Sequence, residues 1–230
     1  MLNNALHAVV QRLDNAAREA GRPPPRLLAV SKLQPAGAVA GLAAAGQRAF
    51  GENYVQEAVA KQAELAGAPG AADLEWHLIG HLQSNKATLA AASFDWVQTV
   101  DRAKLVPLLA QARPDDRPPL NVLIQVNIDD ESSKHGCRPG DAAALADAIA
   151  AQPRLALRGL MAIPAPLPDP ARRRDAFRRM KALFDTLAAT HATMDTLSMG
   201  MSDDFEIAIA EGATMVRVGT ALFGARPARG

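Results

Sequence analysis

Short apolar runs alternate with alanine-rich stretches along most of the chain. The apolar runs have the length of buried strands and lie at residues 27–32, 48–54, 75–80, 95–101, 121–129, 157–164, 195–200 and 215–224. Helical segments separate them, at residues 36–46, 53–66, 84–92, 102–112, 140–151, 170–190 and 203–211. Strands that alternate with helices form parallel βαβ units. Eight such strands in 230 residues predict an α/β fold, a single closed (β/α)8 TIM barrel rather than an open doubly wound sheet.

The chain before the first strand predicts one additional helix. Leu2, Leu6, Val9 and Leu13 recur there at helical spacing. Charged residues interrupt this stretch, so it has neither the apolar core of a secretion signal nor the span of a membrane helix. No GxGxxG follows the first strand, and no linker divides the chain. We therefore expect one domain over residues 1–230, with an extra N-terminal helix.

Composition and charge narrow the class of protein. Hydrophobic residues make up 49% of the chain and charged residues 21%, as in ordinary globular proteins, and the net charge is +1. This balance gives no electrostatic footprint for nucleic acid. The one cysteine, Cys137, cannot form an internal disulfide, which fits a reducing compartment. We expect a cytoplasmic monomer that binds neither nucleic acid nor a membrane.

Three polar residues stand where helices are expected to begin. Ser84 precedes NKATLAAA, Asp101 precedes RAKLVPLLAQA, and Ser202 precedes DDFEIAIAEG. Serine and aspartate side chains accept hydrogen bonds from the first free N–H groups of a helix. We predict that each of the three is an N-cap.

Polar residues also gather at the carboxyl ends of the predicted strands. These ends form one face of a (β/α)8 barrel, and that face carries the active site. His77 and His81 are among these residues, but no carboxylate or cysteine near them in the sequence completes a metal set, so we expect no metal site. The other polar residues at these ends are Lys32, Asn53, Asn127, Ser198, Ser202, Arg217 and Thr220.

The last two strand ends predict an anion site. TIM barrels commonly bind phosphate in the loops after strands 7 and 8. The seventh run ends in SMGMSDD and the eighth continues as VRVGTALFG, and their glycines let backbone N–H groups approach an anion closely. A pair of ordinary glycine turns and helix caps is the alternative.

Lys32 ends a buried strand with a charged group. A lysine that is partly desolvated and near cations has a lowered pKa and can attack an aldehyde. Barrel closure places the first strand next to the eighth, and therefore Lys32 near the phosphate loops. An aldehyde that carries a phosphate suits both features, and pyridoxal 5′-phosphate (PLP) is such a molecule. A solvated surface lysine is the alternative.

Arg217 alternates with Val216 and Val218, so it is expected to point toward the barrel interior or its rim. A guanidinium against the pyridine nitrogen of PLP would disfavour protonation of that nitrogen and make the cofactor a poor electron sink. Against the phosphate it would be a clamp. A structural salt bridge to Asp203 or Glu206 is the third possibility.

Several segments resemble signature segments of the pyridoxal phosphate homeostasis proteins, the YggS/PROSC type. They are AVSKLQP, FGENYVQE, EWHLIGHLQSNK, LIQVNIDDESSKHG, LRGLMAIP and LSMGMSDDFEIAIAEGATMVRVGTALFG, spread over residues 29–224. The resemblance implies a barrel similar to the N-terminal domain of alanine racemase, with PLP held as a Schiff base on Lys32. It places Asn53 beside the ring and Arg217 at or near the ring nitrogen. Around the phosphate it places Ser198, Gly200, Met201, Ser202, Gly219 and Thr220.

The chain departs from the family pattern at two places. Leu33-Gln34 stands where many relatives have a threonine and a basic or small residue, and the tail ends in ARPARG rather than in a lysine-rich sequence. These differences put a second, surface site for PLP in doubt, but not the main one.

We expect a carrier rather than a catalyst. It would hold PLP reversibly, limit the free aldehyde and supply PLP-dependent apoenzymes. The alternative is a PLP-dependent amino-acid racemase, which needs a second acid/base on the opposite face of the substrate. In alanine racemase a tyrosine from another domain supplies it, whereas the only tyrosine of this chain is Tyr54. A third reading is a barrel enzyme for a small phosphorylated sugar, with Lys32 as an aldolase-type base.

Overall fold

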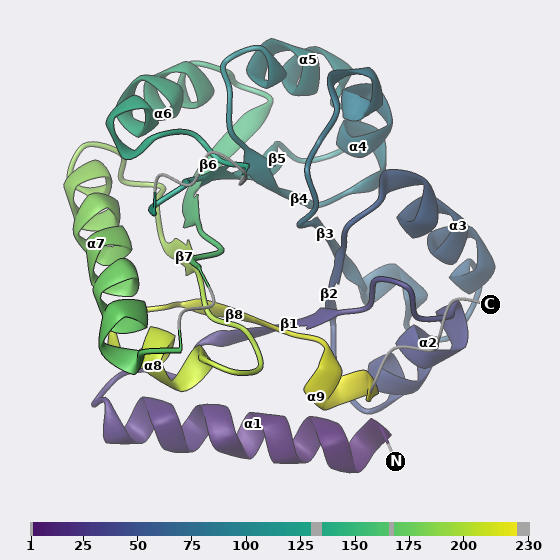
Figure 1. Ribbon diagram of the computed structural model, residues 1–230. Coiled ribbons are helices and arrows are strands. Elements are labelled where there is room, and N and C mark those ends of the chain that lie inside the picture. Colours follow the sequence, from purple (N-terminus) through teal and green to yellow (C-terminus); the bar gives the residue numbers. More distant parts are fainter. Residues whose placement is uncertain (1, 130–134, 166–167, 225–230) are drawn as a thin grey trace.

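Eight parallel strands close into a barrel in the computed structural model, which describes residues 2–129, 135–165 and 168–224. Each strand pairs with the next along the chain, and β8 pairs with β1 (Figure 1). The predicted (β/α)8 architecture is confirmed. The strands are β1 (Arg26–Val30), β2 (Ala49–Glu52), β3 (Glu75–Leu78), β4 (Trp96–Val100), β5 (Leu120–Gln125), β6 (Leu155–Met161), β7 (Thr196–Ser198) and β8 (Met215–Val218).

The ring closes where the first strand meets the last. In this pairing Arg26 lies opposite Met215 and Leu28 lies opposite Arg217. The strands are parallel, so their carboxyl ends lie side by side, with Lys32 beyond one and Gly219 beyond the other. Barrel closure therefore places Lys32 beside the loop after β8, as the sequence predicts.

The alanine-rich segments form the helices that surround the barrel, in keeping with the high helix propensity of alanine. They are α2 (Ala36–Ala44), α3 (Val55–Leu65), α4 (Ala87–Ser93), α5 (Leu105–Ala112), α6 (Ala142–Ala150), α7 (Pro170–Ala188) and α8 (Phe205–Ala210). Short 3-10 turns are η1 (Ala71–Asp73), η2 (Ser84–Lys86) and η3 (Pro139–Asp141), and the described chain ends with α9 (Thr220–Phe223).

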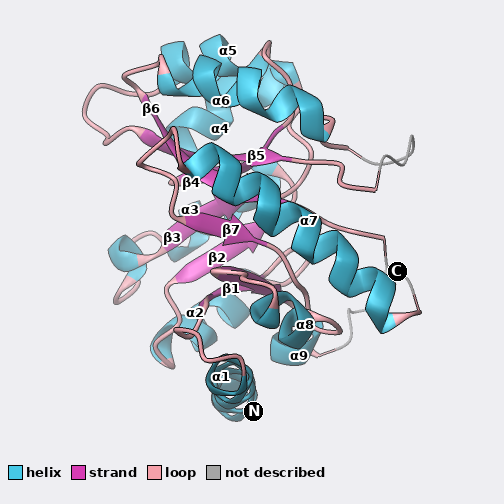
Figure 2. Ribbon diagram, turned by 90° about the vertical axis from the view of Figure 1, so that its left-hand side faces the viewer, coloured by secondary structure: helices cyan, strands magenta, loops and turns pink. Residues whose placement is uncertain are grey.

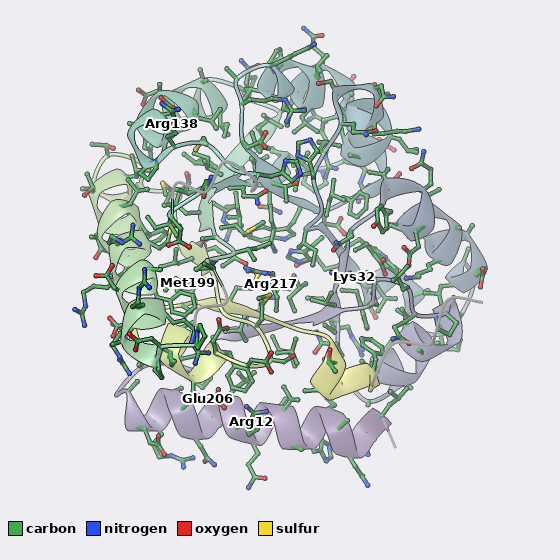
Figure 3. All side chains as sticks on the ribbon, in the orientation of Figure 1. Arg12, Lys32, Arg138, Met199, Glu206 and Arg217 are labelled. Atoms are coloured by element: carbon green, nitrogen blue, oxygen red, sulfur yellow. The ribbon has the colours of Figure 1, made fainter. Side chains whose placement is uncertain are left out.

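The additional N-terminal helix is also present. α1 (Leu2–Glu19) packs against α2, α8 and α9 on the outside of the barrel (Figure 2). Arg12 fixes it to α8, because its Nη2 lies 2.6 Å from Glu206 Oε1 and its guanidinium lies 4.4 Å from the centre of the Phe205 ring (Figure 3). None of the helices in the described ranges is both long and apolar enough to cross a membrane.

Apolar side chains fill both sides of the barrel wall. One large cluster joins the helices to the outward-facing strand residues, among them Ala29, Phe50 and Val97. Inside the barrel, Leu28 packs with Met215 in one small cluster and a second one surrounds Trp96. The interior also contains four buried polar side chains that matter for the site: His77, Gln98, Ser198 and Arg217.

The three predicted N-caps are wrong. Lys104 precedes α5, whereas Asp101 pairs with Arg102 Nη1 at 2.6 Å. Ser84 is the first residue of the turn η2 and caps nothing. Asp204 rather than Ser202 precedes α8, and its carboxylate accepts a hydrogen bond from the Met201 amide at 2.7 Å. The residues that precede α4, α5 and α8 are Lys86, Lys104 and Asp204, and none of their side chains makes a capping hydrogen bond.

Candidate functional site

A pocket of about 270 Å³ opens at the carboxyl ends of the strands. This is the face on which (β/α)8 barrels carry their sites. Apolar walls come from Ile79 after β3 and Ile163 after β6. Most of the residues predicted for the cofactor line the pocket: Lys32, Asn53, Met201, Ser202, Arg217, Gly219 and Thr220.

Lys32 lies at the first turn beyond β1 and is half-buried. The Gln34 amide donates to the Ser31 carbonyl at 3.0 Å and closes this turn. Leu33 inside it has φ of 62°, in the left-handed region that a leucine rarely adopts. The backbone on both sides of Lys32 is therefore held in a defined turn, and the side chain of Lys32 lines the pocket.

Arg217 supplies a buried positive charge at the same pocket (Figure 3). Its side chain is 3% exposed, and the guanidinium donates from Nη1 to Ser198 Oγ at 2.8 Å and from Nη2 to the Ala162 carbonyl at 2.7 Å. Burial lowers the pKa of Arg217 to about 10, against the opposing effect of Asp204, so the group remains cationic at neutral pH. Of the two acidic partners considered from the sequence, Glu206 pairs with Arg12 instead, and Asp203 lines the same pocket but forms no ion pair with Arg217 among the described residues.

A chain of hydrogen bonds continues from Arg217 through the barrel interior. Ser198 Oγ donates to Gln98 Oε1 at 2.7 Å, and Gln98 Nε2 donates to His77 Nδ1 at 2.9 Å. His77 Nε2 then donates to Glu75 Oε1, whose carboxylate also lies 2.8 Å from Arg26 Nη2. Burial lowers the pKa of His77, so the ring is neutral, and this order of donors and acceptors assigns its proton to Nε2.

Two predicted residues lie behind the pocket rather than in its lining. Ser198 is fully buried, and its hydroxyl is used between Arg217 and Gln98. Gly200 has φ of +94°, and a Cβ there would lie 2.6 Å from Ala208 Cβ. Its carbonyl accepts from the Arg217 amide at 3.0 Å. Both residues accept a hydrogen bond from Arg217 and so help to hold it at the pocket. Their direct contact with a ligand stays a prediction.

The apolar pocket walls had no signal of their own in the sequence. Ile79 and Ile163 follow strand ends, as the predicted polar residues do, but an isoleucine there is read first as core. Asp203 and Gln34 also line the pocket and were not predicted. All four lie in the loops that follow β1, β3, β6 and β7, so a place in the first few residues after a strand is the one signal they share.

The expectation about metal ligands was too narrow. Asp101 Oδ2 lies 3.6 Å from His81 Nδ1, and the His135 ring stacks on the His81 ring with centroids 3.8 Å apart. One ligand atom of each lies within 4.8 Å of the others, so a carboxylate and a second histidine do gather near His81. The stacked rings do not point their in-plane lone pairs at one centre, and Arg102 already pairs with Asp101. His77 lies apart from this group, in the barrel interior.

Comparison with known proteins agrees with this architecture. The family model described as alanine racemase, N-terminal domain, matches residues 5–227. The pyridoxal phosphate homeostasis protein of Pseudomonas aeruginosa is 54% identical over 220 residues, which cover 95% of this chain and 93% of the relative. The protein of the same name from Escherichia coli is 51% identical over 230 residues, with 98% of each chain covered.

A solved structure of a relative has the same fold as this chain. PipY of Synechococcus elongatus with PLP bound is 37% identical, with a TM-score of 0.84 over 97% of this chain and all of that one. The fold and the site at its strand ends define a barrel of the alanine racemase N-terminal type. The chain belongs to the pyridoxal phosphate homeostasis protein family.

Proposed function

We propose that this chain binds PLP in the pocket at the carboxyl ends of the strands, holds it as a reversible Schiff base on Lys32, and serves PLP homeostasis by supplying apoenzymes in the cytoplasm. Relatives at about half identity carry the name of that function, and PipY has been solved with PLP bound. The observation that carries the proposal is that the Lys32 amine and the buried Arg217 guanidinium line one pocket.

The residues present fit the chemical groups of PLP. Lys32 offers an amine for the aldehyde, and the hydroxyls of Ser202 and Thr220 are donors for phosphate oxygens. Gly219 lets the loop after β8 pack tightly against the end of β1, because a Cβ there would lie 3.3 Å from the Val30 carbonyl oxygen. Ile79 adds an apolar wall of the kind that a planar ring contacts.

The proposed bond to Lys32 balances without a further reactant. The neutral amine adds to the aldehyde carbon, and loss of one water leaves a C=N bond in place of C=O. Addition of water to that bond returns the amine and the free aldehyde. A carrier needs this reversibility, since release to an apoenzyme is the same step in the opposite direction.

Arg217 favours storage over catalysis. Its guanidinium is fixed by Ser198 and Ala162 within the barrel, and we place it against the pyridine nitrogen rather than the phosphate. A fixed cation there disfavours protonation of the nitrogen, so the bound cofactor is a poor sink for carbanion electrons. Tyr54, the tyrosine that a racemase would use, is 54% exposed and lines the neighbouring pocket beside His81. We therefore propose a carrier without robust catalysis of its own.

A spectrophotometric titration of the purified protein tests the proposal. PLP is added and the near-visible Schiff-base band is followed, with pyridoxine 5′-phosphate as the matched ligand that lacks the aldehyde. We expect a saturable band with PLP and tighter binding of PLP than of its analogue. In Lys32→Ala the band should disappear and the two ligands should bind with equal affinity. Equal affinities with no band in the wild-type protein would contradict the proposal and favour the sugar-phosphate alternative.

A further inference from the structure

A buried cluster of charges lies directly behind the Lys32 turn. It consists of Lys61 on α3 with Glu52 on β2 and Glu57 on α3, and we call it the Lys61 cluster. Lys61 is 5% exposed, and its Nζ donates to Glu52 Oε1 at 2.8 Å, to Glu57 Oε1 at 2.7 Å and to the Ser31 carbonyl at 2.7 Å. An ammonium has three N–H donors, so these three acceptors use all of them.

The cluster contacts both residues that flank Lys32. Glu52 Oε1 accepts from Ser31 Oγ at 2.6 Å, and Glu57 Oε1 accepts from the Leu33 amide at 2.5 Å. Lys61 itself holds the Ser31 carbonyl, the group bonded directly to the Lys32 nitrogen. The backbone before and after Lys32 is therefore fixed by one set of side chains from β2 and α3.

The turn needs this support because of Leu33. A leucine at φ of 62° is in a conformation that persists only where the surroundings hold it. The Glu57 carboxylate is bonded to the amide of this same residue. Buried charges are costly to desolvate and add little net stability on average, so stability alone is a weak reason for them.

We propose that Glu57 and Lys61 are positioning residues, which act through Leu33 and Ser31 to hold the Lys32 turn so that its amine meets the aldehyde of a bound pyridoxal compound. This inference rests on the proposed function for its ligand. It predicts a specific division of labour. The Lys61 cluster controls the reaction of the aldehyde with Lys32, whereas the loops after β7 and β8 bind the phosphate regardless of the cluster.

Glu57→Ala tests the inference, because it removes the contact to Leu33 and leaves Lys61 paired with Glu52. We expect Schiff-base formation with PLP to slow about tenfold or more, since small misplacements of a reacting group have effects of this size. Binding of pyridoxine 5′-phosphate should stay unchanged. Glu57→Gln should restore most of the rate, because the amide oxygen still accepts from the Leu33 N–H. Glu64→Ala, on the exposed face of the same helix, is the matched control.

Amide hydrogen exchange of the protein without ligand separates this inference from the proposed function. In Glu57→Ala the Leu33 amide should lose protection, while the core of α3 keeps it. Unchanged exchange at Leu33, or an equal loss of affinity for both ligands, would overturn the positioning role. If instead the wild-type protein forms no Schiff base while exchange at Leu33 changes as predicted, the proposed function fails and the structural role of Glu57 stands.

Discussion

The Arg217 guanidinium donates a hydrogen bond to the Ser198 hydroxyl over 2.8 Å, and that hydroxyl donates in turn to Gln98 Oε1 over 2.7 Å. Ser198 therefore orients the one buried arginine that lines the described pocket. Its side chain is committed on both its donor and its acceptor side. Ser198, which was predicted to contact the phosphate, thus holds the Arg217 guanidinium that lines the pocket.

Ser198→Ala should destabilise the fold and loosen Arg217. The change leaves Gln98 Oε1 and one Arg217 donor without their buried partner, which costs about 1–3 kcal/mol. The free energy of unfolding, from urea titration, measures the loss, and PLP titration measures the effect on the site. An unaltered stability would show that water replaces the hydroxyl at no cost and that Ser198 does not fix Arg217.

Arg217→Gln should weaken PLP retention and shift the absorption of the bound form. The substitution removes a buried cation that lines the pocket, and charge-assisted hydrogen bonds of this kind are worth about tenfold or more in affinity. Arg172→Gln on the exposed surface of α7 serves as the control. If affinity and spectrum both match the wild-type protein, Arg217 is structural and the assignment to the pyridine nitrogen is wrong.

Acid should destabilise the barrel through the His77–Glu75 pair. Burial lowers the pKa of His77 below its ordinary 6.5, so below that pH the unfolded chain takes up a proton that the folded chain refuses. Although burial opposes it, the hydrogen bond from His77, together with the charge and hydrogen bond of Arg26, lowers the pKa of Glu75 from 4.5 to about 2. Both groups contribute stability at neutral pH that is lost as the pH falls, first below 6.5 and then between 4.5 and 2.

Unfolding free energies measured between pH 8 and pH 5 check the histidine part of this prediction. His77→Gln should flatten the decline, and His7→Gln on the exposed face of α1 should not. A remaining slope is expected from His81, whose pKa is lowered by burial and by His135. A decline as steep in His77→Gln as in the wild-type protein would contradict the assignment of a neutral, buried His77.

Gly200→Ala should be destabilising, whereas the same change at Gly37 should be neutral or favourable. Gly200 has φ of +94° and no room for a Cβ beside Ala208, so alanine there adds strain of about 1–3 kcal/mol. Gly37 lies in α2 with no atom within 4 Å of a built Cβ, and alanine is the better helix former. Thermal unfolding of the two variants tests this prediction, and we expect a lower melting temperature for Gly200→Ala than for Gly37→Ala. Similar melting temperatures would show that the loop after β7 accommodates the alanine without strain.

The pattern of strands and helices was enough to predict the barrel, and barrel closure was enough to bring Lys32 beside the loops after β7 and β8. Both follow from local periodicity and from the rule that parallel strands share one carboxyl face. The resemblance to PLP homeostasis proteins added the roles of individual residues. Lys32, Asn53 and Arg217 do line the same pocket, but their contacts with PLP stay predictions.

Side-chain direction is what the sequence could not supply. β7 is only three residues long, so alternation did not show that Ser198 turns inward to Arg217. Lys61 stands in EAVAKQAEL, where it is read as a solvated helix residue, and only packing of α3 beside β2 makes it buried. Asp101 and His135 meet His81 from different loops, a contact that depends on tertiary structure alone. The tail ARPARG lies outside the described residues.

Borohydride reduction of the PLP-loaded protein, followed by peptide mapping, tests the central claim most directly. Reduction turns a C=N bond into a stable C–N bond and so marks the lysine that formed it. We predict one major pyridoxyl group, on the peptide that contains Lys32, and its loss in Lys32→Ala. Labelling that is spread over surface lysines, or undiminished in Lys32→Ala, would contradict the assignment of Lys32 as the residue that captures PLP.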